Sequence, residues 1–567
     1  MRADWLNLNG LWSFAWDEDD RGRAAGWSAA PELPLRIVVP FCPESVQSGL
    51  HDEEPHTTCW YARSFDLPEE LQGRRLLLHF GAVDYEAEVW LNGQYLGRHV
   101  GGYDPFMFEV SAHLRLQGNR LVVRVHDDPA DAKPCGKQSP DRHPSGCRYM
   151  RVTGIWQTVW LEAVGAAYLA DWTLTAAADG SVRFVGEVSG AASQIALRVL
   201  LDGREVAAAR ATIHAGHAEL SFVVAQPRLW SPADPALYDL ELAVLDEDGR
   251  TLDAVTTYTG FRSIEIAGGQ MLLNGEEFFL ISALDQGYNP EGLYTPPTDD
   301  FQREDVLWAR RYGLNSIRKH QIVPEPRFLY WCDRLGLTVW GEMADWGADI
   351  IAGGDELLRQ WAACMRRDRN HPCIITWVPT NERWRPATPT HSLAKTRIYR
   401  ATRQMDPTRP AIDTSGYCHT ETDICDLHVN PADGEACRRW WEAWRASIAA
   451  TGNFPAYPDR PAYDPGHRHR GQPVVISETG NWWIRALPTS GPWTNYGYGP
   501  VETVEEFVAL YRDFFLALMG EPDCAGFSYV QLYDVEGEVN GYLTYDRRPK
   551  VAPEVIAAIH AEGLGRR

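Results

Sequence analysis

From Ser263 onward, strand-like apolar runs alternate with helix-length amphipathic segments, and this rhythm constrains the fold more than any other sequence feature. The runs predicted as strands are 278–284, 315–320, 337–343, 373–382, 410–415, 424–430, 473–478 and 524–530. Helices are predicted at 299–312, 325–335, 355–368, 391–405, 434–448, 502–519 and 553–562. Eight such units in about 300 residues are what a (β/α)₈ TIM barrel requires, so residues 263–567 are predicted to form one.

The chain before Ser263 lacks this alternation and is predicted to be all-β. Residues 1–165 contain short alternating runs separated by Gly, Asn and Pro, and Asn92-Gly93 between two of these runs is a strong hairpin signal. Residues 166–262 contain further strands with regular turn signals, as is typical of an immunoglobulin-like β-sandwich. The sequence therefore predicts two β domains followed by a barrel.

The net charge and the cysteines indicate which binding partners and which cellular compartment to expect for this protein. The 567 residues carry a net charge of −23 with no long basic block, which disfavours nucleic acid or an anionic membrane as a partner. The 11 cysteines form no C-x-x-C pair, and we find neither an apolar leader nor a membrane-length apolar run. We therefore expect a soluble, cytoplasmic protein with reduced thiols, and a homo-oligomer is left open.

In a (β/α)₈ barrel the carboxyl ends of the strands carry the working side chains. Polar residues at or just beyond the predicted strand ends are Asp285, Gln286, Arg318, Lys319, His320, Glu342, Asn381, Glu382, His428, Asn430, Glu478, Gln531 and Asp534. Glu382 and Glu478 lie three strands apart, so they can face one another across the pocket. Paired carboxylates suit glycosidic cleavage, in which one protonates the leaving oxygen and the other attacks the anomeric carbon. For either glutamate considered alone, a structural ion pair with a nearby Arg or Lys is as good an interpretation as a catalytic role.

Other reaction classes find less support in the sequence. The first barrel strand ends in Asp285-Gln286-Gly287, where many metal-dependent barrel hydrolases have H-x-H. His467 and His469 have that spacing, but they fall in a long insertion at 451–471, where a solvated loop is favoured. The chain has no G-x-S-x-G elbow and no Gly-rich phosphate loop. No metal site is predicted.

Several separate segments carry a resemblance to a known family. They are 8–14, 59–63, 78–93, 154–162, 229–232, 237–238, 260–262, 370–372, 381–382 and 477–478. Together they resemble glycoside hydrolase family 2, which contains β-galactosidases, β-glucuronidases and β-mannosidases. The resemblance covers nearly the whole chain and implies that residues 1–165 form a jelly-roll sugar-binding sandwich ahead of the immunoglobulin-like domain and a catalytic barrel.

The resemblance also implies a mechanism. Glu478 would be the nucleophile and Glu382 the general acid/base of a retaining double displacement. Asn381 would hydrogen-bond the sugar 2-hydroxyl, and Arg318 would lie beneath Glu478 and keep it ionised. Burial is expected to raise the pKa of Glu382, so that it holds a proton near neutral pH. No cofactor is required for this chemistry; some relatives use Mg²⁺, and that ion is left open.

The sugar is predicted from the loop after the last strand. The family's glucuronidases have an N-x-K element there that binds the sugar carboxylate, whereas this chain has the acidic segment 534–541, which would repel a uronate. We therefore expect a glycoside with a neutral terminal sugar, as for a β-galactosidase-like exo-glycosidase. Asp285, His320, Glu538 and Asn540 are predicted to hold that sugar.

Two departures from the family pattern affect the pocket. Many relatives have a Tyr near the end of the sixth strand, whereas the run 426–431 of this chain contains none. Many also have a Trp at the end of the eighth strand, where this chain has the run 528–531. Either His428, Trp483 and Tyr529 form this part of the pocket in place of the missing residues, or the pocket binds a sugar whose shape differs from that of a common hexopyranoside. Arabinopyranosides, galactofuranosides, mannosides and glucuronides stay open as substrates, and a non-catalytic carbohydrate-binding protein stays open as another class.

Overall fold

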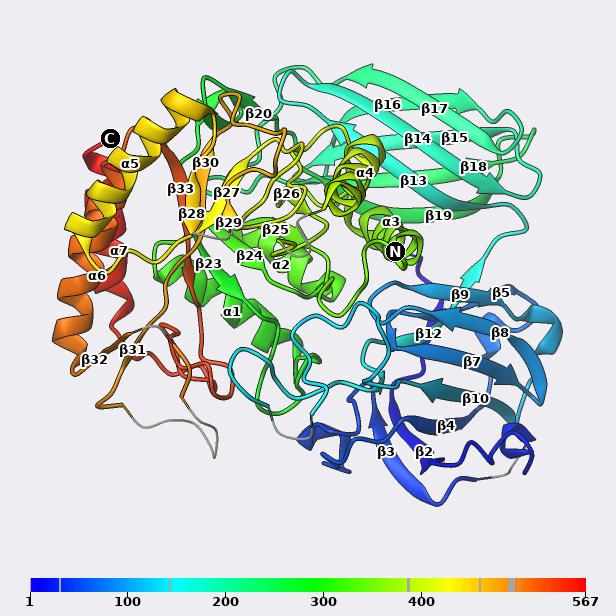
Figure 1. The fold of residues 1–567 in the computed structure, drawn as a ribbon. Coiled ribbons are helices and arrows are strands. Elements are labelled where there is room, and N and C mark those ends of the chain that lie inside the picture. The colour runs from blue at the N-terminus through cyan, green and yellow to red at the C-terminus, as the bar shows by residue number, and fades with distance from the viewer. Residues whose placement is uncertain are drawn as a thin grey trace.

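The computed structural model describes residues 2–29, 32–141, 144–384, 388–457, 460–487, 495–497 and 499–567. Two β-sandwiches and a barrel follow one another along the chain, and both sandwiches lie against the same side of the barrel (Figure 1). Polar contacts join the three parts: Trp230 Nε1 donates to Asp333 O at 2.8 Å, and Gln360 Nε2 donates to Tyr85 Oη at 2.8 Å. The β domains therefore form walls around the barrel.

The N-terminal domain is a sandwich of two antiparallel sheets. The larger has the order β3-β2-β4-β10-β7-β8, with bounds Leu35–Val39, Gly10–Trp16, Thr58–Phe65, Asn119–His126, Glu86–Leu91 and Gln94–Val100. The smaller has the order β1-β12-β5-β9, with bounds Trp5–Asn7, Val159–Val164, Arg75–Phe80 and Phe106–Glu109. β6 (Val83–Asp84) pairs with β11 (Gly154–Ile155). Short 3₁₀ helices lie at Trp27–Ala29, Val46–Ser48, Glu69–Leu71 and Ser111–His113.

The β7–β8 connection is the hairpin that the sequence predicted. Asn92 and Gly93 have φ values of 53° and 79°, and a type I′ turn requires positive φ at both of these positions. The strands on either side alternate their side chains between the two faces of the sheet. Phe14, Val89 and Val123 thereby meet in the fully buried core between the sheets.

The second domain packs a three-stranded sheet on a four-stranded one. The first has the order β13-β14-β17, with bounds Tyr168–Ala176, Ser181–Ser189 and His217–Val223. The second has the order β16-β15-β18-β19, with bounds Arg204–Thr212, Gln194–Leu201, Tyr238–Leu245 and Thr251–Thr259. Alternation in β14 and β18 places Phe184 and Leu240 in the shared core. The immunoglobulin-like sandwich is therefore confirmed.

The third domain is a parallel sheet curled into a barrel. Its strand order is β26-β25-β24-β23-β33-β30-β27, with bounds Ile374–Val378, Thr338–Glu342, Ser316–Lys319, Leu280–Asp285, Cys524–Val530, Val474–Gly480 and Cys425–His428. The predicted strand 410–415 is irregular: an isolated bridge joins it to β26 at Trp377–Ala411, and a second joins it to the segment after β26 at Asn381–Ser415. Pro410 has no N–H to donate, and the chain turns at Gly416 with a φ of 104°, so a regular ladder does not form.

Helices cover the outside of the barrel. In the described chain they are α1 (Asp299–Arg311), α2 (Pro326–Leu335), α3 (Gly354–Asp368), α4 (Pro389–Met405), α5 (Gly434–Thr451), α6 (Val504–Met519) and α7 (Pro553–Gly565). Thr298, Thr388, Asp433 and Thr503 cap their N-termini by accepting a backbone N–H. Within the described residues, none of the helices has the length and apolar character needed to cross a membrane.

The amino-terminal end of the barrel is closed by apolar packing. The small sheet β20-β21-β22 (Ile264–Ala267, Gln270–Leu273, Glu276–Glu277) places Met271 against Leu280, Trp340 and Val475 inside the barrel. The opposite end is bordered by β28 (Pro455–Tyr457) and β29 (Arg460–Pro461) of the insertion, and by the pair β31 (Trp482–Ile484) and β32 (Gly499–Val501). The carboxyl ends of the strands therefore border the open end of the barrel.

Candidate active site

Glu382 and Glu478 lie together at the open end of the barrel. Glu478 is part of β30, whereas Glu382 follows β26 in a left-handed backbone conformation (φ 53°) that few non-glycine residues adopt. The Glu382 N–H donates to Ser415 O at 2.9 Å and holds this turn. A carboxylate oxygen of Glu382 lies within 4.8 Å of one of Glu478. The barrel therefore brings the two predicted carboxylates to one place.

Arg318, on β24, connects the residues beneath this pair. Its Nε donates to Glu342 Oε2 at 2.8 Å, Nη2 donates to Asn381 Oδ1 at 2.9 Å, and Nη1 donates to Glu478 Oε1 at 3.2 Å. Burial alone raises the pKa of Glu342, but Arg318 and His320 lower it to about 2. A permanent cation thus lies directly against Glu478, where the sequence led us to expect it.

His320 and His428 complete the surroundings of Glu478. His320 Nδ1 is 2.9 Å from Glu342 Oε1, and its Nε2 is 3.5 Å from Glu478 Oε1. Burial lowers the pKa of His320. His428, at the end of β27, lies between the two glutamates: Nδ1 is 3.0 Å from Glu382 Oε1, and Nε2 is 3.4 Å from Glu478 Oε1.

The pKa of Glu382 differs from the sequence prediction. Burial raises it, as predicted, but the hydrogen bond and charge of His428, together with His320 and Lys137, bring the pKa below the ordinary value. The expectation of a raised pKa is therefore wrong for the resting protein, because it considered burial without these neighbours.

These side chains line a cavity of about 470 Å³. Of the predicted residues, those in its lining are His320, Glu382, His428, Glu478 and Glu538. Arg318 and Asn381 lie just behind, in hydrogen-bond contact with that layer. Lining residues that we did not predict are Lys137, Cys147, Tyr417, Tyr457, Arg460, Asn481 and Tyr496, and most of these belong to loops outside the barrel strands.

Lys137 reaches the cavity from the N-terminal sandwich. Its Nζ is 3.7 Å from Glu538 Oε2 and 5.7 Å from the ring centroids of Tyr149 and Trp346. The Tyr149 hydroxyl also donates to Glu538. Burial lowers the pKa of Lys137, but Glu538, Glu478 and Glu382 outweigh it, so the pKa is raised and the side chain stays charged.

The remaining predicted residues are placed outside the cavity lining. The Asp285 carboxylate accepts from Lys319 Nζ at 2.8 Å and from Tyr533. Tyr529 is fully buried, stacked on Tyr542 with ring centroids 4.4 Å apart. Asn540 is buried behind the lining and donates to Asn481. Trp483 is half-buried in β31. Asn540 and Tyr529 therefore support the lining from behind, since the Tyr529 hydroxyl donates to Asn540 O and Asn540 contacts Asn481.

The insertion at 451–471 borders the cavity through Tyr457 and Arg460; its residues 458 and 459 lie outside the described chain. The Arg460 guanidinium lies over the Trp384 ring, 4.2 Å from its centroid. His469 Nε2 is 2.9 Å from Gln472 O. The insertion therefore supplies a wall of the site.

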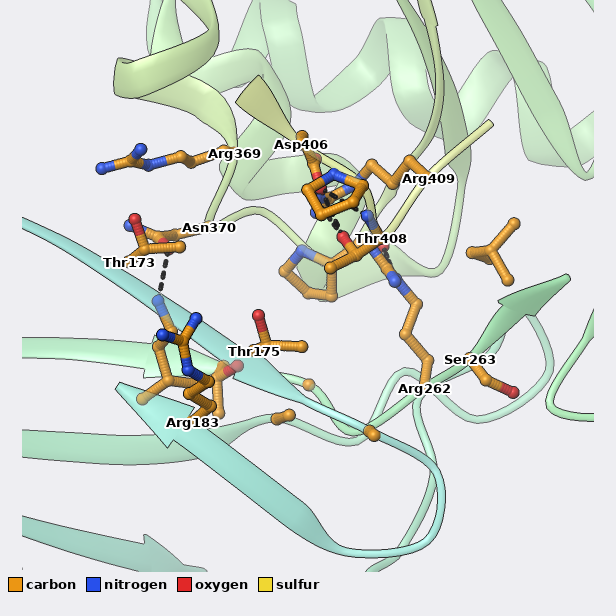
Figure 2. Close-up of a pocket in the computed structure, with 18 of the residues that line it drawn as sticks. Thr173, Thr175, Arg183, Arg262, Ser263, Arg369, Asn370, Asp406, Thr408 and Arg409 are labelled. Atoms are coloured by element: carbon orange, nitrogen blue, oxygen red, sulfur yellow. Dashed lines mark hydrogen bonds and ion pairs between the residues drawn. The ribbon is translucent and has the colours of Figure 1, made fainter. Parts of the chain in front are cut away.

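A larger cavity, of about 630 Å³, lies between the second domain and the amino-terminal end of the barrel (Figure 2). Arg262 Nη2 donates to Ile374 O at 2.9 Å, and Arg409 Nε donates to the same carbonyl at 2.7 Å. Burial and the charge of Arg409 lower the pKa of Arg262 to about 9. These groups hold the domain junction together, and Asp406 is the only carboxylate in the lining, so the paired acids of a glycosidase are found only at the other end.

The Arg318 guanidinium supplies a positive charge beside Glu382, His428 and Glu478. Among the described residues, Glu382, His428 and Glu478 are the one group of three acidic, histidine or cysteine side chains close enough to share a metal ion. The Arg318 guanidinium, however, lies 3.2 Å from both Glu478 Oε1 and His428 Nε2 and fills that electrostatic role. We assign no metal here, and the expectations about cofactors and Mg²⁺ stay predictions.

The barrel, its two sandwiches and the carboxylate pair define a glycoside hydrolase, and comparisons with known families agree. The model for the glycosyl hydrolases family 2 sugar binding domain matches residues 6–162, the central family 2 model matches 167–262, and the TIM barrel domain model matches 264–478. This chain belongs to glycosyl hydrolases family 2.

Two relatives within the family differ in activity. A β-glucuronidase of Paenibacillus borealis is 26% identical over 413 residues, which cover 66% of this chain and 67% of that protein. A β-galactosidase of Thermoanaerobacter pseudethanolicus is 26% identical over 422 residues, 67% of this chain but only 51% of the relative. The match thus spans about half of that β-galactosidase.

Solved structures of the family share the whole fold. A Bifidobacterium dentium β-glucuronidase complexed with coumarin-3-O-glucuronide superposes with a TM-score of 0.80 at 22% identity, covering 98% of this chain and 97% of that one. A Ruminococcus gnavus β-glucuronidase in complex with D-glucuronic acid gives 0.80 at 20% identity, with the same coverage. At these identities the likeness establishes the fold alone.

Proposed function

We propose that this glycoside hydrolase is a retaining exo-β-glycosidase that releases a neutral terminal sugar, with a β-galactoside as the first candidate substrate. The observation that carries the proposal is the approach of Glu382 and Glu478 carboxylate oxygens to within 4.8 Å. Retaining enzymes hold their carboxyl groups ~5–5.5 Å apart, whereas inverting enzymes need ~6.5–9.5 Å to admit a water. The spacing therefore favours double displacement.

The surroundings of each carboxylate favour one role. Glu478 is in contact with the Arg318 guanidinium, which stabilises the charged form that a nucleophile needs. Glu382 has no Arg or Lys among its hydrogen-bond partners in the described chain and faces His428 instead, so it is the group that can gain and lose a proton. We therefore assign Glu478 as nucleophile and Glu382 as acid/base.

The sugar is proposed from the groups facing the two glutamates. Glu538 is buried in the cavity wall, where its carboxylate can accept bonds from sugar hydroxyls. A second candidate, a glucuronide, is favoured by one observation: Lys137 Nζ lies in the same wall and could bind a sugar carboxylate. Because Lys137 faces Glu538 at 3.7 Å, most of its charge is already compensated, and we rank the neutral sugar first.

A panel of chromogenic glycosides tests this proposal. We expect turnover of β-D-galactopyranosides above that of arabinopyranosides, galactofuranosides, mannosides and glucuronides. The anomer released first, followed by NMR, should be the β form. Release of the α anomer would reject the retaining mechanism. Failure on every sugar of the panel at several pH values would instead favour a carbohydrate-binding protein.

A further inference from the structure

His428 lies where it can exchange a proton with Glu382. Its Nδ1 is 3.0 Å from Glu382 Oε1, which is a hydrogen-bond distance. Among the described residues, His428 is the one side chain that hydrogen-bonds the Glu382 carboxylate. This contact is therefore a direct route for a proton between Glu382 and the described part of the protein.

We propose that His428 and Glu382 act together as the acid/base of the retaining reaction, sharing one proton that His428 Nδ1 supplies to Glu382 as the leaving group departs. This role rests on the function proposed above. The imidazole of His428 has a basic ring nitrogen that can hold such a proton.

The other ring nitrogen has partners in both protonation states. Ser415 Oγ lies 3.1 Å from Nε2 and donates its own hydrogen to Asp426, so its lone pairs can accept from a protonated Nε2. Because the proton leaves from Nδ1, Nε2 keeps its hydrogen in the imidazolium and in the neutral ring, and Ser415 Oγ accepts it in both. Arg318 Nη1, 3.2 Å from Nε2, has only hydrogens to offer and donates to Ser477 O and Glu478 Oε1. Proton transfer at Nδ1 therefore requires no movement of the ring.

The charges around His428 change during the reaction. Charged or titratable groups that face His428 or its partner Glu382 are Glu382, Glu478, Arg318, Asp426, Tyr417, His320 and Lys137. In the free enzyme, the ionised Glu478 lies 3.4 Å from Nε2 and stabilises an imidazolium against Arg318. Once Glu478 is glycosylated that negative charge is gone, so the neutral ring is favoured at the moment the proton has left.

The proton balance of the two steps follows. In the first, Glu478 bonds to the anomeric carbon and the bond to the leaving oxygen breaks. That oxygen takes the one shared proton, which passes from His428 Nδ1 through Glu382, so Glu382 ends the step ionised and His428 ends it neutral. In the second, a water attacks the anomeric carbon, the bond to Glu478 breaks, and the water's proton passes to Glu382 and back to Nδ1. After the second step, Glu478 is free again and the His428–Glu382 pair holds its shared proton as at the start.

Two variants and two leaving groups test this role. His428→Phe removes both nitrogens, whereas His428→Asn keeps an N–H that can donate to Glu382 but no titratable proton. The substrates are phenyl and dinitrophenyl glycosides of the sugar that the wild type turns over. A phenyl leaving group needs a proton and a dinitrophenyl group does not. We expect both variants to lose about 10²-fold or more in kcat/KM on the phenyl glycoside and far less on the dinitrophenyl glycoside.

His469→Asn, in the insertion and outside the cavity lining, is the matched control and should leave both substrates unchanged. Retained dinitrophenyl turnover shows that a variant is folded, and its melting temperature provides a second check. Equal losses on both substrates, or wild-type behaviour of His428→Asn, would overturn the role, since a merely positioning residue needs only the N–H. A wild type inactive on all dinitrophenyl glycosides would reject the proposed function itself.

Discussion

Asn381 Oδ1 accepts a 2.9 Å hydrogen bond from Arg318 Nη2, and this contact fixes the direction of the Asn381 amide. The Nδ2 end is buried and has no hydrogen-bond partner in the described part of the chain. A buried donor without a partner costs free energy, so it is available to a ligand hydroxyl. The same guanidinium thus orients the amide that we propose to bind the sugar and contacts the proposed nucleophile, Glu478.

Asn381→Ala should reduce transition-state stabilisation at the sugar 2-hydroxyl. We expect kcat/KM to fall about 10²-fold on the normal substrate, a typical cost of removing one well-placed donor. On the matching 2-deoxy glycoside, which lacks the hydroxyl, wild type and variant should differ little. Equal losses on both substrates would show that Asn381 acts elsewhere.

Azide should distinguish the two glutamates. Glu478→Gly removes the proposed nucleophile and should lower kcat by about 10⁴-fold or more. Azide can then attack from the vacated side, giving a glycosyl azide of inverted configuration. Azide rescue of Glu382→Ala should instead give the retained product, because the covalent intermediate still forms. NMR of the glycosyl azides is the measurement, and the reverse pattern would exchange the assignments.

Glu536 should make stability depend on pH. Burial raises its pKa to about 8, and among the described residues its carboxylate oxygens accept only from Met150 N, each at 3.1 Å. Since the folded pKa lies above the unfolded value of about 4.3, the folded state favours the protonated form. That stabilisation is complete below pH ~4 and is lost as the pH rises towards 8.

Glu536→Gln should therefore be close to wild type in stability at pH 5 and more stable at pH 8, by on the order of 2 kcal/mol or more. Urea unfolding at both pH values measures the difference. A stability difference that does not change between the two pH values would contradict the expectation.

Lys137→Met should separate the two candidate sugars. For a neutral substrate we expect KM to rise about 10-fold with little change in kcat, because one hydrogen-bond donor to the sugar is lost. Arg183→Met, on the second domain and remote from the catalytic cavity, is the control and should have no effect. A fall of about 10²-fold or more confined to glucuronides would favour the glucuronide, since a charged pair is then broken.

Most of the fold could be predicted because each domain repeats one short pattern. The positions of Glu382 and Glu478 could also be predicted, because all the parallel strands of a barrel have their carboxyl ends on the same side. The segment 410–415 was harder: its apolar pattern suggests a strand, but Pro410 and the following turn disrupt the ladder.

Sequence patterns could not place the side walls of the cavity. Lys137 and Arg460 come from loops whose paths depend on how three domains pack, which no local periodicity records. Tyr529 shows the same limit in a strand: β33 is buried on both faces, so its pattern does not say which side chains turn inward. The lowered pKa of Glu382 likewise depends on His428, 46 positions further along the chain.

The position of Lys137 has a consequence for engineering. A barrel excised at residue 264 would keep Glu382 and Glu478 but would leave Glu538 without its ammonium partner and without the Tyr149 hydroxyl. Without that wall, Glu538 would face water, and neither Lys137 nor Tyr149 would hold its carboxylate in position. The catalytic barrel is therefore not a transplantable module, and chimeras that exchange substrate preference within this family should move the N-terminal loop together with the barrel.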